Sequence, residues 1–242
     1  MTVPYFLVDA LPGGPSYTVD GPEGHHAAVV QRLRIGERLV LTDGRGGTAN
    51  AVVTAVGRGS LDVTLISQEY AQPLAPRLVV VQGIAKGDRG ELAVQAMTEA
   101  GVDEIVPWAA SRSVVQWRGE RGERAYARWV AVSREAAKQS RRAWLPSVAP
   151  AAATDAVGVR LAGAALGLVL YEDAATRLST VDLPACGEMA LVVGPEGGIA
   201  LDELARFEAA GAIPVRLGET VLRTSTAGVA ALAVLSARLG RW

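Results

Sequence analysis

Cysteine and histidine are almost absent from this 242-residue sequence, which contains one Cys and two His. The single Cys186 excludes a disulfide within the chain and a cluster of thiolate metal ligands from one chain. His25 and His26 are adjacent, so a histidine-based zinc site is not expected either. We therefore expect chemistry that uses no bound metal.

Long hydrophobic runs are lacking as well. No apolar segment approaches the roughly 20 residues that a membrane-spanning helix needs. The first ten residues do not combine a basic flank with an apolar stretch, as an export signal does. Half of the residues are hydrophobic and 20% are charged, as in globular proteins. We expect a cytoplasmic protein with no membrane partner.

The net charge of −1 gives no reason by itself to expect a nucleic-acid partner, but the charges are segregated. Residues 111–142 carry nine Lys or Arg against three Asp or Glu, whereas residues 143–210 carry three against nine. On a helical projection of the basic segment, Ala125, Trp129, Val132 and Ala136 form one apolar stripe. The opposite arc holds Arg124, Arg128, Arg134, Lys138, Arg141 and Arg142. A solvated helix face is the ordinary explanation, but so one-sided an arc favours contact with RNA phosphates.

Two regions of different pattern follow one another along the chain. Residues 38–42 and 51–67 contain short β-branched runs broken by Gly and Asp, which predicts a small β-rich module with one short helix over residues 25–33. Pro73 and Pro76 mark an extended linker. We predict two domains, residues 1–72 and residues 73–242.

The second region alternates apolar strands with amphipathic helices. Parallel strands are predicted over residues 77–85, 102–107, 167–171, 189–193 and 213–217. Helices are predicted over residues 89–100, 123–140, 201–210 and 224–239. This alternation predicts an α/β domain with a mostly parallel sheet.

Two loops lie where ligands bind in such sheets. The first, GPEGG at residues 194–198, follows one strand and precedes a helix, and the second, LGETVLRTSTA at residues 217–227, has the same setting. Glycines let a ligand approach the backbone, and a helix start offers unpaired N–H groups. Each loop alone could be a tight turn or a helix cap. Because both lie at carboxyl ends of parallel strands, they would meet at one crevice if those strands are neighbours.

These segments resemble the ribosomal RNA small-subunit uridine N3-methyltransferase family of the SPOUT superfamily of knotted methyltransferases. GPEGG is similar to the second cofactor motif of that family, and LGETVLRTSTA to the third. KGDRGELAVQAMTEAGVDEIVPWAASRSV and RWVAVSREAAKQSRRAWLP resemble its central block, and HHAAVVQRLRIGERLVLTDGRGG its N-terminal block. The resemblance covers most of the chain and is weakest at residues 150–167.

The resemblance implies a trefoil knot near the C-terminus, an N-terminal β-barrel of the PUA type that binds RNA, and a homodimer. It also implies S-adenosylmethionine as cofactor, held largely by backbone groups. Carried over by position, the cofactor-binding residues are Leu170, Tyr171, Glu172, Gly194, Pro195, Glu196, Gly197, Gly198, Leu217, Gly218, Val221, Leu222 and Thr224. The Ala-rich helix over residues 224–239 supports a dimer, with Gly228 and Ala231 allowing close approach.

The expected reaction is methylation of a uridine at N3 in small-subunit (16S) ribosomal RNA, and the partner is that RNA or the small ribosomal subunit. Negative charge spreads to the uracil oxygens during attack, and Arg223 is the first candidate to stabilise it. Glu196 is a candidate to accept the proton, or else to hold loop amides. Supporting RNA contacts are expected from Lys86, Arg89, Arg112 and Arg142, and phosphate contacts from Arg134, Lys138 and Arg141.

Two positions depart from the family pattern. Ser225 stands where the third motif often has an acidic residue, so no base is assigned there. Ala200 stands where a capping residue often precedes the helix, which leaves Asp202 and Glu203 to complement the helix dipole.

Two other functions stay open on the sequence alone. One is a knotted enzyme that methylates a ribose 2′-OH in tRNA or ribosomal RNA. The other is a non-catalytic RNA-binding or ribosome assembly factor with the same fold.

Overall fold

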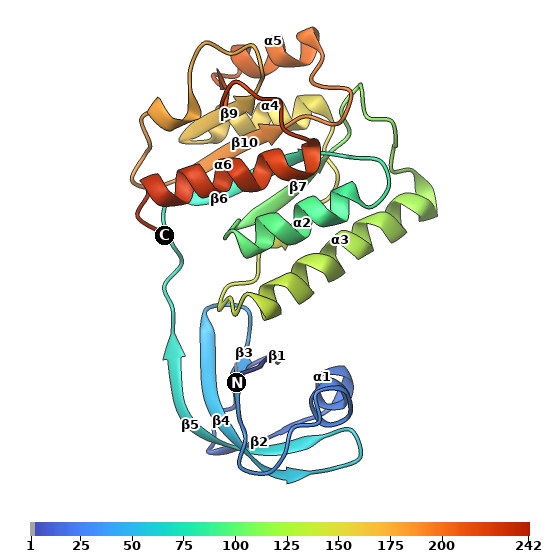
Figure 1. The fold of residues 1–242 in the computed structure, drawn as a ribbon, viewed down its shortest axis with the longest axis vertical. Coiled ribbons are helices and arrows are strands. Elements are labelled where there is room, and N and C mark those ends of the chain that lie inside the picture. Colours follow the sequence, from blue (N-terminus) through green and yellow to red (C-terminus); the bar gives the residue numbers. More distant parts are fainter. Residues whose placement is uncertain (1–2) are drawn as a thin grey trace. The chain divides into compact units, whose positions relative to one another are not determined.

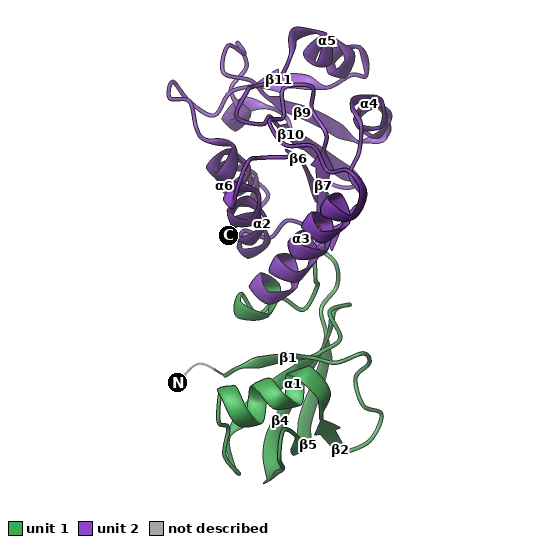
Figure 2. Cartoon of the chain, turned by 90° about the vertical axis from the view of Figure 1, so that its right-hand side faces the viewer, with its two compact units in different colours: residues 1–73, 137–145 green, residues 74–136, 146–242 purple. Residues whose placement is uncertain are grey.

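The computed structural model describes residues 3–242, which divide into two compact units (Figure 2). Unit 1 comprises the chain up to residue 73 together with residues 137–145, and unit 2 comprises residues 74–136 and 146–242. The predicted domains, 1–72 and 73–242, stay a prediction. Within residues 3–242, no helix is both long enough and apolar enough to cross a membrane.

Unit 1 is a curved five-stranded sheet with the strand order β1-β3-β4-β5-β2 (Figure 1). Its elements are β1 (Tyr5–Leu7), β2 (Ser16–Val19), α1 (Gly21–His25), a π-helical turn (His26–Val30), β3 (Arg38–Thr42), β4 (Gly47–Val56) and β5 (Leu61–Tyr70). Leu61 and Val63 of β5 are buried while Asp62 and Thr64 are exposed, the alternation of a sheet with one buried face. The predicted β-rich module is confirmed. Strands β1 and β2 were not predicted because runs of three and four residues carry too little periodic signal.

Residues 137–145 are held in unit 1 by specific contacts. The indole Nε1 of Trp144 donates to the carbonyl of Ala71 at 2.8 Å, and Lys138 Nζ lies 2.9 Å from Glu23 Oε1. The side chains of Lys138 and Glu23 are only 7% and 13% exposed. The prediction that Lys138 lies on an exposed basic arc is therefore wrong, because its ammonium group is buried in an ion pair.

Unit 2 contains a six-stranded sheet in the order β11-β9-β10-β6-β7-β8, and every pairing is parallel. Its strands are β6 (Arg77–Gly83), β7 (Glu104–Trp108), β8 (Ser147–Val148), β9 (Leu166–Leu170), β10 (Glu188–Val193) and β11 (Ile213–Val215). Its helices are α2 (Arg89–Glu99), α3 (Gly119–Gln139), α4 (Thr154–Gly163), α5 (Leu201–Ala209) and α6 (Thr224–Arg238), with a 3-10 turn at Leu178–Thr180; α3 ends within unit 1. The predicted α/β fold is confirmed, and the knot stays a prediction.

Alternate residues of each strand enter two separate cores. Leu78 and Val80 of β6 pack with α2, α3 and α6 on one face, whereas Val79 and Val81 pack with α4 and α5 on the other (Figure 1). Helix α4 was not predicted because its sequence, TDAVGVRLAG, is rich in Gly and Ala and buries only Val157 and Leu161 completely. Burial of both faces explains why the strands read as continuous apolar runs.

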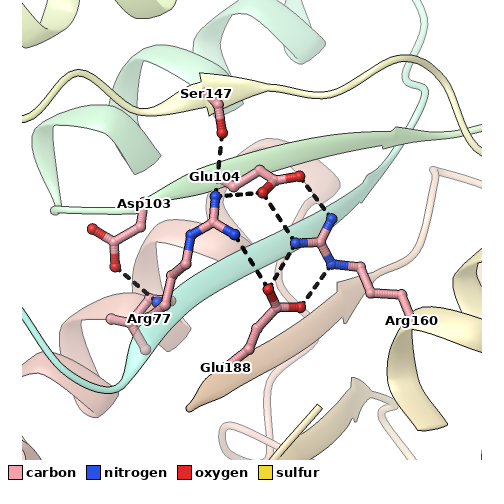
Figure 3. Close-up of polar contacts among 7 residues, drawn as sticks. Arg77, Asp103, Glu104, Ser147, Arg160 and Glu188 are labelled. Atoms are coloured by element: carbon pink, nitrogen blue, oxygen red, sulfur yellow. Dashed lines mark hydrogen bonds and ion pairs between the residues drawn. The ribbon is translucent and has the colours of Figure 1, made fainter. Parts of the chain in front are cut away.

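Charged side chains pair with one another at the amino edge of this sheet (Figure 3). Arg160 of α4 makes bidentate contacts with Glu188, at 2.7 and 2.8 Å, and with Glu104, at 2.7 and 3.0 Å. Arg77 begins the central strand β6 and lies 2.6 Å from Glu104 and 3.4 Å from Glu188. The network joins the first residues of β6, β7 and β10 to α4.

Two small residues of helix α6 pack against other elements of the same chain. A Cβ on Gly228 would lie 2.6 Å from the sulfur of Met97 in α2, and Ala231 is fully buried. The expectation that these two residues face a second chain is therefore wrong, because they let α6 pack closely against α2.

Candidate active site

A cavity of about 520 Å³ lies at the carboxyl ends of β9, β10 and β11, in unit 2. These three strands are neighbours, so the loops that follow them converge, as the sequence predicted. All thirteen residues predicted to bind the cofactor line this cavity: Leu170, Tyr171, Glu172, Gly194, Pro195, Glu196, Gly197, Gly198, Leu217, Gly218, Val221, Leu222 and Thr224. Their cofactor contacts stay a prediction.

The GPEGG loop requires glycine for two reasons, close packing and backbone conformation. A Cβ on Gly194 would lie 2.9 Å from a side-chain carbon of Ile199, and a Cβ on Gly197 would lie 2.7 Å from the carbonyl oxygen of Arg112. Gly198 has a φ of +72°, a conformation that favours glycine. At these three glycines the loop has only backbone groups to offer a ligand in the cavity.

A buried hydroxyl joins the two motif loops. Thr224 Oγ1 donates to the carbonyl of Gly194 at 2.7 Å and accepts from Gln82 Nε2 at 2.9 Å. Gln82 is 1% exposed and comes from the central strand β6. Thr224 thus fixes the start of α6 to the GPEGG loop, and its hydroxyl is already engaged in both directions.

Glu196 fastens a third loop to the same place. Its Oε1 accepts from the backbone N–H of Lys86 at 3.0 Å and from Arg89 Nη1 at 3.1 Å. Burial acts to raise the pKa of Glu196, but hydrogen bonds from its own amide, the Lys86 amide and Arg89 outweigh it and lower that pKa. A carboxylate stabilised in this way is a weak base. Of the two roles considered for Glu196, the geometry favours holding loop amides over accepting a proton.

Arg223 is exposed at the cavity wall, directly before α6. Its carbonyl accepts from the amides of Thr226 and Ala227, which anchors its backbone. In the described part of the chain, its guanidinium has no acidic partner. Its side chain is therefore available to a ligand in the cavity.

The predicted RNA-binding residues are distributed over both units. Arg89 and Arg112 line the cavity, and Lys86 lies in the loop that Glu196 fastens. Arg134 is exposed on α3 and Arg141 is exposed in unit 1, whereas Arg142 is half-buried. Their RNA contacts stay a prediction, and buried Lys138 is the one whose placement argues against such a role.

Five lining residues lie outside the motif segments: Val193, Ile199, Leu201, Val215 and Arg216. Most of the five flank a motif directly, and extending each motif by two residues would have included all of them except Leu201. Thr220 and Ala227 lie within LGETVLRTSTA but were assigned no role from the sequence. Ala227 lies three residues after Thr224, which is nearly one helical turn, and could have been found from that spacing.

The lining suits S-adenosylmethionine. Leu170, Val193, Leu222 and Ala227 offer apolar contacts for an adenine ring, while the glycine loop and Glu172 offer polar groups for the charged end. The volume lies within the range of about 300–1,000 Å³ that is common for small-molecule sites. Among residues 3–242, no three His, Cys, Asp or Glu side chains are grouped so as to hold a metal ion.

A family model described as the RNA methyltransferase domain matches residues 72–236, which include the whole cavity. The chain belongs to the RNA methyltransferase domain family. A second model, the RNA methyltransferase PUA domain, matches residues 19–66. This match agrees with the small β-module expected from the sequence.

Relatives of this RNA methyltransferase family align over nearly the whole chain. The sequence is 46% identical to a ribosomal RNA small subunit methyltransferase E of Mycobacterium tuberculosis, with 100% of this chain and 94% of the relative covered. A Bacillus subtilis protein of the same name is 27% identical, with 92% and 90% covered. The crystal structure of the Neisseria gonorrhoeae protein of that name, bound to S-adenosyl methionine, has a TM-score of 0.88 and 27% identity, with 98% of each chain covered.

Proposed function

We propose that this protein transfers a methyl group from S-adenosylmethionine to N3 of a uridine in small-subunit ribosomal RNA. The observation that carries this proposal is the 46% identity, over the whole chain, to a ribosomal RNA small subunit methyltransferase E. The cavity formed by the two motif loops supports it, because a relative of the same fold was crystallised with S-adenosyl methionine. The RNA substrate implies a cytoplasmic reaction.

The cofactor supplies a methyl group that is already activated by its sulfonium, so the protein must contribute alignment and electrostatics. The backbone of residues 194–198 and 217–222 is suited to hold the cofactor. Arg223, exposed beside it and without an acidic partner in residues 3–242, is suited to donate to a uracil oxygen as negative charge develops there. Glu196 holds the loop that carries Lys86 and Arg89 against the GPEGG loop.

The protein is also proposed to act as a homodimer. Leu201 and Val221 line the cavity yet are 70% and 76% exposed, which leaves apolar surface at the rim that a second copy would cover. Sedimentation at micromolar concentration tests this proposal. A monomer that is fully active would contradict it.

The experiment for the reaction is methyl transfer to small-subunit RNA, offered both free and as assembled subunits, from a strain that lacks the enzyme. Mass spectrometry of the nucleosides should show 3-methyluridine. Detection of a 2′-O-methylated nucleoside instead would overturn the uridine N3 assignment. Failure to bind S-adenosylmethionine would overturn the enzymatic function and favour an RNA-binding assembly factor.

A further inference from the structure

A buried carboxylate lies beside the cavity without lining it. Glu203, in the first turn of α5, is 2% exposed and accepts hydrogen bonds from three segments of unit 2. Its Oε1 accepts from the Ser111 amide at 2.9 Å and from Thr154 Oγ1 at 2.9 Å, and its Oε2 accepts from the Ala200 amide at 3.2 Å. Capping α5 requires only the last of these bonds. The other two join α5 to the loop after β7 and to the start of α4.

The loop after β7 carries Arg112 into the cavity wall. A Cβ on Gly197 would lie 2.7 Å from the carbonyl oxygen of Arg112, so this loop packs directly against GPEGG. The only direct polar contact of the Arg112 guanidinium within residues 3–242 is a long one, 3.5 Å from Nη1 to the carbonyl of Gly197. Its position therefore depends on its backbone, and the adjacent Ser111 amide is held by Glu203.

We propose that Glu203 is a positioning residue for Arg112: it fixes the loop of residues 109–113 against the GPEGG loop, so that the Arg112 guanidinium faces the RNA substrate. This proposal rests on the proposed function. It parallels the contacts of Glu196 with the Lys86 amide and the Arg89 guanidinium. Glu196 thus fastens Lys86 and Arg89, and Glu203 fastens the loop of Arg112, to the GPEGG–α5 segment.

The structure offers a matched control. Glu203→Met removes both acceptor oxygens, and with them all three hydrogen bonds, at nearly constant volume. Thr154→Val removes the hydroxyl that lies between Glu203 and the Trp108 indole, but leaves the Ser111 amide bonded to Glu203. Both variants lose buried hydrogen bonds, so both should lower thermal stability. Only Glu203→Met should release the loop.

The first measurement is hydrogen exchange of the cofactor-free protein. Peptides covering residues 109–113 should exchange faster in Glu203→Met than in the parent, and those of Thr154→Val should not. This measurement needs no activity. If the parent protein failed to methylate RNA, the proposed function would fail while the contact between Glu203 and the loop would still be tested.

The second measurement is single-turnover methyl transfer with both substrates saturating. Glu203→Met should slow transfer on the order of 10- to 100-fold, as misplacement of a substrate-positioning group does, with cofactor affinity nearly unchanged. Thr154→Val should stay close to the parent rate. Glu203→Gln should recover most of the rate, because its amide oxygen can still accept from Ser111 and Thr154.

The double variant Glu203→Met with Arg112→Ala decides whether Glu203 acts through Arg112. It should be no slower than Arg112→Ala alone. Multiplicative effects of the two changes, or equal rate losses in Glu203→Met and Thr154→Val, would overturn the proposal. If Glu203→Met does not fold, Glu203→Asp keeps the charge but withdraws the carboxylate by one methylene, and the same comparisons apply.

Discussion

The two edges of the parallel sheet in unit 2 differ in how completely their arginines are paired with carboxylates. At the amino edge, Arg77 and Arg160 are neutralised by Glu104 and Glu188 through contacts of 2.6–3.4 Å. At the carboxyl edge, Arg89 and Arg216 pair with Glu196 and Glu219, but Arg112 and Arg223 line the cavity and have no acidic partner among residues 3–242. A cation that already has its carboxylate contributes to stability, whereas a cation without one is available to a ligand. The contrast predicts which substitutions reduce activity and which reduce stability.

The largest effect is expected for Arg223→Ala. Loss of one preorganised donor to a developing oxyanion costs on the order of 10² to 10³ in rate. Cofactor affinity and thermal stability should change little, because the cofactor contacts are expected from backbone groups and the Arg223 side chain is exposed. Single-turnover transfer, cofactor titration and thermal unfolding measure the three quantities.

Arg206→Ala is the matched control for Arg223→Ala. Arg206 is an exposed arginine of the same unit that pairs with Asp155 at 2.8 Å and does not line the cavity. Arg206→Ala should leave the transfer rate, the cofactor affinity and the thermal stability near the parent values. If the rate constant of Arg223→Ala equalled that of Arg206→Ala, Arg223 would have no part in the reaction.

The opposite result is expected for Arg160→Met at the amino edge. Glu104 and Glu188 would lose their bidentate partner, which should reduce the free energy of unfolding by about 2–4 kcal/mol, somewhat less than for a completely buried pair. The transfer rate of the folded fraction should stay normal. Denaturant unfolding and single-turnover kinetics measure the two effects. If Arg160→Met were as stable as the parent but slower in methyl transfer, the amino edge would contribute to the reaction as well as to stability.

Much of this fold could be predicted from the sequence because both sheet faces are buried. Burial makes residues 78–81 of β6 and 189–193 of β10 continuous apolar runs, and strand–helix alternation then implies a parallel sheet. Helix α4 escaped prediction because packing rather than propensity stabilises it, since Gly158 lies in its middle and only two of its side chains are completely buried.

The parts of the candidate site that are formed by backbone groups could be predicted from the sequence. The parts that depend on contacts between side chains far apart in the sequence could not. Glycine-rich loops after strands are visible in the sequence, so the cavity lining was identified. The contact between Glu203 and Ser111 joins residues 92 positions apart, and no pattern in either segment predicts it. The burial of Lys138 likewise depends on Glu23, 115 residues away, so helical periodicity alone placed Lys138 on the wrong side.

The difference between cations with and without an acidic partner is also present in unit 1. Arg141 is exposed, with no acidic partner in the part of the chain that the structure covers, whereas Lys138 is buried against Glu23. Arg141→Ala should flatten the salt dependence of RNA binding by about one unit in slope, as loss of one phosphate contact does. Lys138→Met should lower stability and leave the slope unchanged. A flatter slope for Lys138→Met alone would reverse the assignment.

The smallest effect concerns acid sensitivity of the amino edge. Burial acts to raise the pKa of Glu104, but Arg160 and Arg77 outweigh it and hold that pKa below its usual 4.5. Because the folded-state pKa is depressed, the stabilisation is complete above the unfolded value and is lost as pH falls through the folded value. Glu104→Gln should therefore be less stable than the parent by a constant amount from about pH 5 to pH 8, and the two should converge at lower pH.

Glu120→Gln is the matched control, because Glu120 is 88% exposed and its pairing with Arg124 adds little stability. Unfolding free energies measured against pH test this, and a parent and Glu104→Gln that decline in parallel in acid would show that Glu104 does not carry the effect.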